Sequence, residues 1–143
     1  MRNKQIIIEI VVILLVILFL YTGISKLVDF KGFTSDLNNQ PFPNSLTPVL
    51  SWALPIAEIA IVVALSFERN RLIGLYAALL LMSLFTMYNA LVLLHVFDYV
   101  PCSCGGVISK LTWPQHLVFN IFFVIIIFIA IKKHKSTISY NIQ

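Results

Sequence analysis

The chain has 143 residues, of which 59% are hydrophobic and 11% are charged. Soluble domains carry about 25% charged residues, so this composition excludes an ordinary soluble protein and indicates an integral membrane protein. The formal net charge is +4, but the Lys and Arg residues cluster at the ends of apolar segments, where such residues set topology. No nucleic-acid-binding motif is present, and we expect the lipid bilayer to be the main partner.

The first apolar segment, 6–27, follows a basic start. It is longer than the hydrophobic region of a signal peptide, and no cleavage site with small residues follows it. We therefore predict an uncleaved transmembrane helix. Glu9 lies near its beginning, where the carboxylate could reach the membrane interface or pair with Arg69 or Arg71.

The connection after this segment, 28–45, carries a second helical pattern. Phe30, Phe33 and Leu37 recur at helical spacing with charged residues between them. This pattern predicts a short amphipathic helix that lies on the membrane surface.

Three further segments, 46–67, 72–96 and 113–131, are each long enough to cross a bilayer, which takes about 20 mostly apolar residues. They lack the alternation of barrel strands, and a helix satisfies its backbone polar groups within each span. We predict an all-α fold, a four-helix transmembrane bundle in a single domain over 1–143, with the short amphipathic helix on the periplasmic side between spans one and two.

The start of the last span is marked by a capping signal. Thr112 can cap the helix, Gln115 stands three residues later in capping-box position, and Pro114 is tolerated in a first turn. These residues place the helix boundary close to Trp113.

The distribution of Lys and Arg predicts the orientation. Four spans put both termini and the turn at 68–71 on one side, which holds seven basic residues: Arg2, Lys4, Arg69, Arg71, Lys132, Lys133 and Lys135. The other side holds three, Lys26, Lys31 and Lys110. The positive-inside rule therefore predicts a multi-pass protein of the bacterial inner membrane with cytoplasmic termini, and a third loop that faces the periplasm.

That third loop contains both cysteines of the chain, Cys102 and Cys104. Disulfides form and persist on the oxidising side of a membrane, and a Cys-x-Cys disulfide closes a very small, strained ring of the labile and catalytic kind. A static loop staple is one alternative, although so small a ring constrains little chain. A soft-metal site is another, but two thiolates do not fill a zinc site, and we predict no metal.

Glu58 is the second candidate, because it lies near the middle of the second span. An ionisable residue at membrane depth is costly and indicates a functional site. Glu58 could relay a proton or hydrogen-bond the carbonyl of a quinone. The structural alternative is a protonated or paired Glu that holds helices together, with Tyr88 and Asn89 as candidate partners.

Lys26, His95 and His116 all fall at the outer ends of spans, level with the cysteine loop. A cationic side chain or an imidazole near a thiol lowers the thiol pKa and can shuttle protons. Alternatively, these side chains extend to the interface. His116 is the stronger of the two histidines because it follows the loop closely.

Three stretches together resemble a known family: 19–27 (FLYTGISKL), 55–58 (PIAE) and 101–106 (PCSCGG). They are similar to the MauE/DoxX-like membrane proteins, and the last stretch is similar to the MauE branch, the methylamine utilisation proteins. The resemblance implies a four-helix membrane bundle associated with redox processes. It also implies that Cys102 and Cys104 are the redox pair, and that Glu58 and Lys26 are characteristic polar positions of the bundle.

MauE proteins are linked to the maturation of methylamine dehydrogenase, whose small subunit is rich in disulfides, and DoxX-like relatives are linked to quinone-coupled sulfur oxidation. The resemblance thus implies a membrane thiol–disulfide redox protein that forms or isomerises disulfides in periplasmic clients, beside a thioredoxin-like partner and with a quinone as candidate cofactor. Such a protein would be a thiol–disulfide oxidoreductase. The alternatives are a non-enzymatic assembly or scaffold subunit of a membrane complex, and a small transporter or heavy-metal carrier.

Overall fold

A computed structural model of the chain describes residues 2–96 and 111–141, and within them the side chains of 3–96 and 111–136. Its elements are α1 (Arg2–Val28), α2 (Phe30–Asn38), α3 (Thr47–Ser66), α4 (Arg71–Leu93) and α5 (Trp113–Asn141), with short 3₁₀ turns at Asn44–Leu46 and Glu68–Asn70. Four stretches have the length and composition to cross a membrane: Asn3–Val28, Asn44–Ser66, Glu68–Leu93 and Trp113–Ser136. The prediction of an all-α, four-span membrane protein is confirmed.

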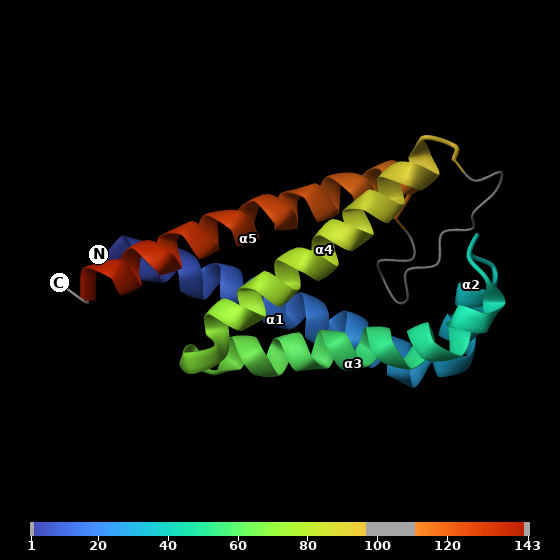
Figure 1. Cartoon of the computed structure of the whole chain (residues 1–143), viewed down its shortest axis with the longest axis horizontal. Coiled ribbons are helices and arrows are strands. Elements are labelled where there is room, and N and C mark those ends of the chain that lie inside the picture. The colour runs from blue at the N-terminus through green and yellow to red at the C-terminus, as the bar shows by residue number, and fades with distance from the viewer. Residues whose placement is uncertain (1, 97–110, 142–143) are drawn as a thin grey trace.

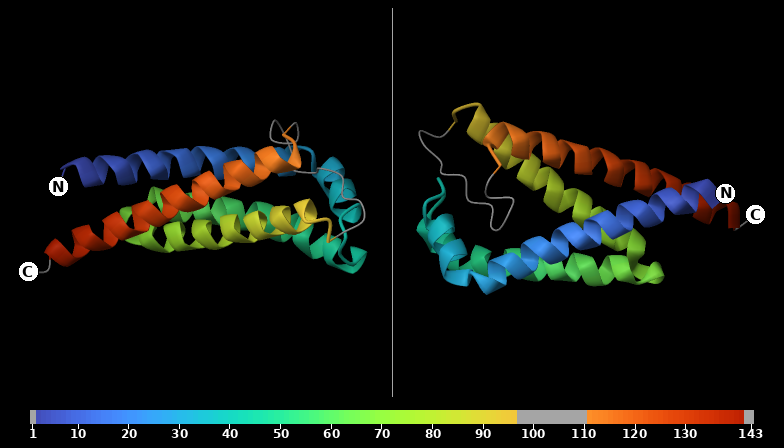
Figure 2. Two further views of the ribbon diagram at one scale, coloured as in Figure 1. Left: turned by 90° about the horizontal axis from the view of Figure 1, so that it is seen from above. Right: turned by 180° about the vertical axis from the view of Figure 1, so that it is seen from behind.

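The helices pair in a fixed pattern. α1 packs against α3 and α5, and α4 packs against α5 and α3 (Figures 1 and 2). α3 and α4 meet at the turn of residues 68–70 and diverge from it, so the bundle has a closed turn end and a wider end that α2 crosses (Figure 1). Both termini lie at the turn end, as an even number of spans requires.

The core runs along the middle of the bundle. Leu15 and Phe19 of α1 pack with Leu65 of α3, Leu75 of α4 and Ile127 of α5, and all five side chains are buried. Many outward-facing Ile, Leu, Val and Phe side chains are exposed, which suits contact with lipid rather than water. The turn end is closed tightly, because a Cβ atom on the glycine at position 74 would lie only 2.9 Å from the backbone nitrogen of Leu65.

The ends of α4 and α5 differ from the predicted ones. α4 ends at Leu93 rather than at 96, because His95 has a φ of 54° and ends the helix in a left-handed residue. His95 N–H donates to Val92 O and Val96 N–H donates to Leu91 O, the two bonds of a Schellman motif. α5 continues beyond 131 to Asn141, since the lysines that follow the apolar run are themselves good helix formers.

α2 forms where the amphipathic pattern predicted a helix. It begins after Asp29, whose carboxylate accepts a hydrogen bond from the backbone N–H of Gly32. Its apolar side chains Phe33 and Leu37 are buried against the bundle, and α2 packs on α3. The apolar face of α2 therefore covers protein surface at the wide end of the bundle, and the position of α2 at the membrane surface stays a prediction.

Candidate functional site

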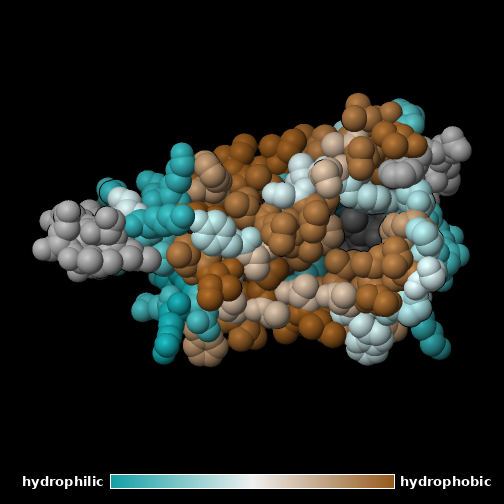
Figure 3. Space-filling view, in the orientation of Figure 1, coloured by the Kyte–Doolittle hydropathy of each residue, from teal (hydrophilic) through white to brown (hydrophobic). Residues whose placement is uncertain are grey.

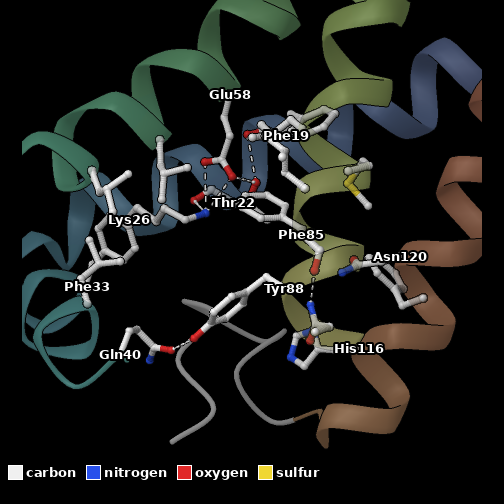
Figure 4. A pocket seen from close by; sticks show the side chains of 18 of the residues that line it. Phe19, Thr22, Lys26, Phe33, Gln40, Glu58, Phe85, Tyr88, His116 and Asn120 are labelled. Atoms are coloured by element: carbon white, nitrogen blue, oxygen red, sulfur yellow. Dashed lines mark hydrogen bonds and ion pairs between the residues drawn. The ribbon is translucent and has the colours of Figure 1, made fainter. Parts of the chain in front are cut away.

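A cavity of about 320 Å³ lies at the wide end of the bundle. All five helices and the segment after α2 contribute to its lining. Figure 3 shows the surface hollowed between α3 and α4, within a mostly apolar face, and Figure 4 shows the side chains around the cavity. The cavity exists because α3 and α4 diverge from the turn and leave space that α2 only partly covers.

A buried ion pair joins α1 to α3 in the wall of this cavity. Lys26 Nζ lies 2.8 Å from Glu58 Oε1 and 3.1 Å from Oε2, and only 10% and 1% of the two side chains are exposed. Thr22 donates its hydroxyl to Glu58 Oε1, and its backbone carbonyl accepts from Lys26 Nζ. Such a pair is tolerated at depth because both charges are compensated and hydrogen-bonded.

The glycine at position 23 makes room for this contact between α1 and α3. A Cβ atom there would lie 3.2 Å from Ile59 Cδ1 and 3.4 Å from Glu58 Cβ. Small residues let transmembrane helices approach closely. Thr22 and Lys26 are four residues apart, which puts both on the helix face that meets α3.

A second polar group lines the cavity from α4 and α5. Asn89, His116 and Asn120 are all buried, with exposed fractions of 3%, 2% and 7%. Asn89 Nδ2 donates to the backbone carbonyl of Phe85 at 2.8 Å. Figure 4 shows His116 and Asn120 on the α5 side of the cavity, away from the ion pair.

Side chains from five segments contact one another around the outer rim of the cavity: α1, α2, the segment after α2, α4 and α5. Tyr88 donates its hydroxyl to Gln40 Oε1, which links α4 to the segment after α2. The Tyr88 ring packs edge-on against Trp113 of α5, with centroids 6.3 Å apart. Lys26 Nζ also lies 5.7 Å from the centre of the Phe33 ring on α2.

Three of the residues singled out from the sequence meet here, since Lys26, Glu58 and His116 all line this cavity. Neither Lys26 nor His116 extends to the interface, because both are buried. Cys102 and Cys104 lie outside the described residues.

The other candidates have different surroundings. Glu58 is hydrogen-bonded to Lys26 and Thr22. Its two expected partners line the same cavity but bond elsewhere, Tyr88 to Gln40 and Asn89 to the carbonyl of Phe85. Glu9 pairs with Arg71 near the turn end, one of the two partners expected for it.

The sequence reasoning missed Thr22, Gln40 and Asn120. Two of them carried a signal, because Thr22 lies four residues before Lys26 and Asn120 lies four residues after His116, and such residues share a helix face. Gln40 had none, since its contact depends on where α2 directs the chain. No group of three or more His, Cys, Asp and Glu side chains in the described part of the chain could hold a metal ion.

Comparison with known proteins gives one match. The family model described as methylamine utilisation protein MauE matches residues 4–133. A search of curated proteins and a search of solved structures found no match. The matched range covers all four candidate spans almost completely and includes the residues that line the cavity. The chain therefore belongs to the MauE family of multi-pass membrane proteins.

Proposed function

We propose that the protein is a membrane thiol–disulfide redox protein that forms or isomerises disulfides in periplasmic clients, in the service of methylamine utilisation. The observation that supports this most is the position of the dithiol in the chain. The cysteines lie between α4 and α5, and the facing ends of these two helices carry Asn89 and His116 into the same cavity as the ion pair. A short length of chain thus joins the dithiol to a cavity that contains an ion pair and a buried imidazole.

The proposed exchange starts from an oxidised pair. A client thiolate attacks Cys102, breaks the Cys102–Cys104 bond and forms a mixed disulfide, while Cys104 leaves as a thiolate. A second client thiolate then attacks the mixed disulfide, which leaves a client disulfide and a reduced pair. Two electrons and two protons pass from client to protein in each cycle.

Reoxidation of the pair needs a two-electron acceptor, and a membrane quinone is our candidate. The cavity fits such a group, because it is open towards the lipid face and lined by aromatic rings and a neutral ion pair. A bound quinone would supply the capacity to take up two electrons and two protons. In this proposal His116 carries protons between the thiols and the cavity. Lys26 and Glu58 provide a fixed polar group in the cavity wall.

The proposal includes an orientation, with both termini in the cytoplasm and the cysteines in the periplasm. It follows from the excess of Lys and Arg at the turn end. Periplasmic exposure would bring Cys102 within reach of a thioredoxin-like partner or a client protein.

The test is the redox state of the pair in cells, read by acid quenching and thiol alkylation. We expect a mixture of oxidised and reduced forms that shifts with respiration, and a trapped client adduct in Cys104→Ser. Cys102→Ser should abolish both client oxidation and adduct formation, while Ser103→Ala, between the two cysteines, should leave them intact. A pair fixed in one state without an adduct would instead favour the non-enzymatic scaffold.

A further inference from the structure

The amide of Asn89 has a fixed orientation, and no described residue donates a hydrogen bond to its oxygen. Its Nδ2 donates to the carbonyl oxygen of Phe85, and because a carbonyl can only accept, the nitrogen must face Phe85. Oδ1 is then directed away from that carbonyl. Oδ1 has no hydrogen-bond partner among the described residues, although only 3% of Asn89 is exposed. A buried acceptor without a donor is unfavourable, so a ligand with an N–H or O–H group would be stabilised here.

The charges of the cavity favour a neutral ligand. Lys26 and Glu58 are the only Lys, Arg, Asp or Glu residues among the described residues that line it. Lys26 Nζ donates to both carboxylate oxygens of Glu58. Thr22 adds one hydrogen bond to each partner, since its hydroxyl donates to Glu58 Oε1 and its backbone carbonyl accepts from Lys26 Nζ. A charged ligand would therefore have to break this pair or enter without a counter-charge.

The shape and chemistry of the walls favour a flat ring. Aromatic side chains line the cavity from α1, α2, α4, α5 and the segment after α2: Phe19, Phe33, Phe42, Phe85, Tyr88, Trp113 and Phe119. Aromatic rings pack well on one another in offset or edge-on arrangements. The volume of about 320 Å³ lies within the usual range of small-molecule sites, about 300–1,000 Å³.

The opening of the cavity suits a ligand that enters from the lipid. Leu84 of α4 lines the cavity and is nevertheless 48% exposed, so it lies where the cavity meets the outer surface. Figure 3 shows apolar side chains beside and below the hollow, and more polar ones on the side of the wide end. A ligand that dissolves in the bilayer could reach the cavity between α3 and α4 without crossing water.

We propose that this cavity binds a neutral, membrane-soluble aromatic alcohol, a phenol or hydroquinone, whose hydroxyl donates to Asn89 Oδ1. The binding is inferred from the cavity alone, whereas a redox role for the bound ligand rests on the proposed function. A quinone carries only acceptors, whereas its reduced form carries hydroxyl donors, so the site favours the reduced form. Asn89 is then a specificity-determining residue for the redox state of the ligand.

The test compares an alkylated 1-naphthol with its methyl ether, which share a ring but differ in the hydroxyl donor. Both are titrated into the full chain in lipid nanodiscs, with tryptophan fluorescence as the readout and affinities expressed per mole fraction of probe in lipid. We expect the naphthol to bind at least five times more tightly than the ether. Asn89→Leu should bring the naphthol down to the affinity of the ether and leave the ether within a factor of two.

Asn70→Leu is the matched control, because it makes the same exchange at an exposed position just before α4. It should keep the preference for the naphthol. If Asn89→Leu does not fold, Asn89→Met, with a more adaptable side chain, takes its place. Equal binding of the two probes, or a preference that survives loss of the Asn89 amide, would overturn the inference.

The two proposals can fail separately. The variant with both Cys102→Ser and Cys104→Ser should lose client exchange and keep the naphthol preference. Preserved exchange without the preference would reject the ligand assignment alone. A preserved preference without any client adduct would reject the redox function and leave the binding site standing.

Discussion

Lys26 Nζ of α1 lies 2.8 Å from Glu58 Oε1 of α3, and both side chains are almost completely buried. This contact joins the first span to the second across the wall of the cavity. Breaking such a pair from one side leaves an uncompensated charge inside the protein, which costs about 3–5 kcal/mol. Removing both charges avoids that penalty.

Lys26→Met and Glu58→Leu should therefore each strongly lower the free energy of unfolding, by about 3–5 kcal/mol. The double variant should regain most of that loss, because neither charge remains. The measurement is a double-mutant cycle from denaturant unfolding in mixed micelles. A coupling energy near zero would mean that the two charges do not depend on each other.

The Glu9–Arg71 pair near the turn end should matter much less. Glu9 is 49% exposed, so solvent screens the contact, and exposed pairs contribute under about 1 kcal/mol. We expect Glu9→Gln to have a small effect that shrinks further as salt is raised. Unfolding of this variant at low and high salt, beside Lys26→Met, checks the contrast; a large effect that persists at high salt would contradict it.

Two glycine-to-alanine changes should differ in cost. Gly74→Ala brings a Cβ to 2.9 Å from the backbone nitrogen of Leu65, whereas Gly23→Ala meets the flexible end of Ile59 at 3.2 Å. Overpacking against backbone costs about 1–3 kcal/mol, while a side-chain end can move. Thermal unfolding should show a clear loss for Gly74→Ala and a smaller one for Gly23→Ala, and the reverse order would rule out this explanation.

His95→Gly should stabilise the protein by about 1 kcal/mol, since glycine adopts the left-handed conformation without a Cβ penalty. His95 has a φ of 54° at the end of α4. His95→Ala, which keeps the Cβ atom, is the control and should leave stability nearly unchanged. If His95→Ala instead impaired client exchange, the imidazole would have the redox role that its position in the sequence suggested.

Asp36 of α2 should make the stability of the folded protein depend on pH. Partial burial, together with the negative charge of Asp29, raises the pKa of Asp36 above its ordinary value of 3.8. The ionised carboxylate therefore weakens the folded state, so stability is lost as the pH rises from about that value through the raised pKa. Asp36→Asn should flatten this part of the pH profile of unfolding, and an identical profile in both proteins would contradict the assignment.

Much of the fold could be predicted from the sequence, because long apolar runs in a membrane protein have few alternatives to helices. The capping residues at the start of α5 placed its boundary correctly, and the Thr112 backbone N–H donates to Gln115 Oε1 as a capping box requires. The end of α4 could not be predicted, since the left-handed conformation was adopted by a histidine rather than a glycine.

The candidate site was only partly visible in the sequence. Lys26, Glu58 and His116 stood out because each is polar at the end or middle of an apolar span. Their meeting in one cavity, and the pairing of Lys26 with Glu58, depend on how α1 packs on α3 and how α3 diverges from α4. A single sequence does not encode that divergence in a readable pattern, and the same is true of the contact between Gln40 and Tyr88.

The separation of Lys26 and Glu58 by 32 positions has a consequence for synthesis of the protein. The first span leaves the ribosome with its lysine before the carboxylate that neutralises it has been made. Until the second span arrives, the ammonium group is most stable among the lipid headgroups, with the helix shifted towards that side. Final insertion of the first span and its docking on the second should therefore be a single coupled event in biogenesis.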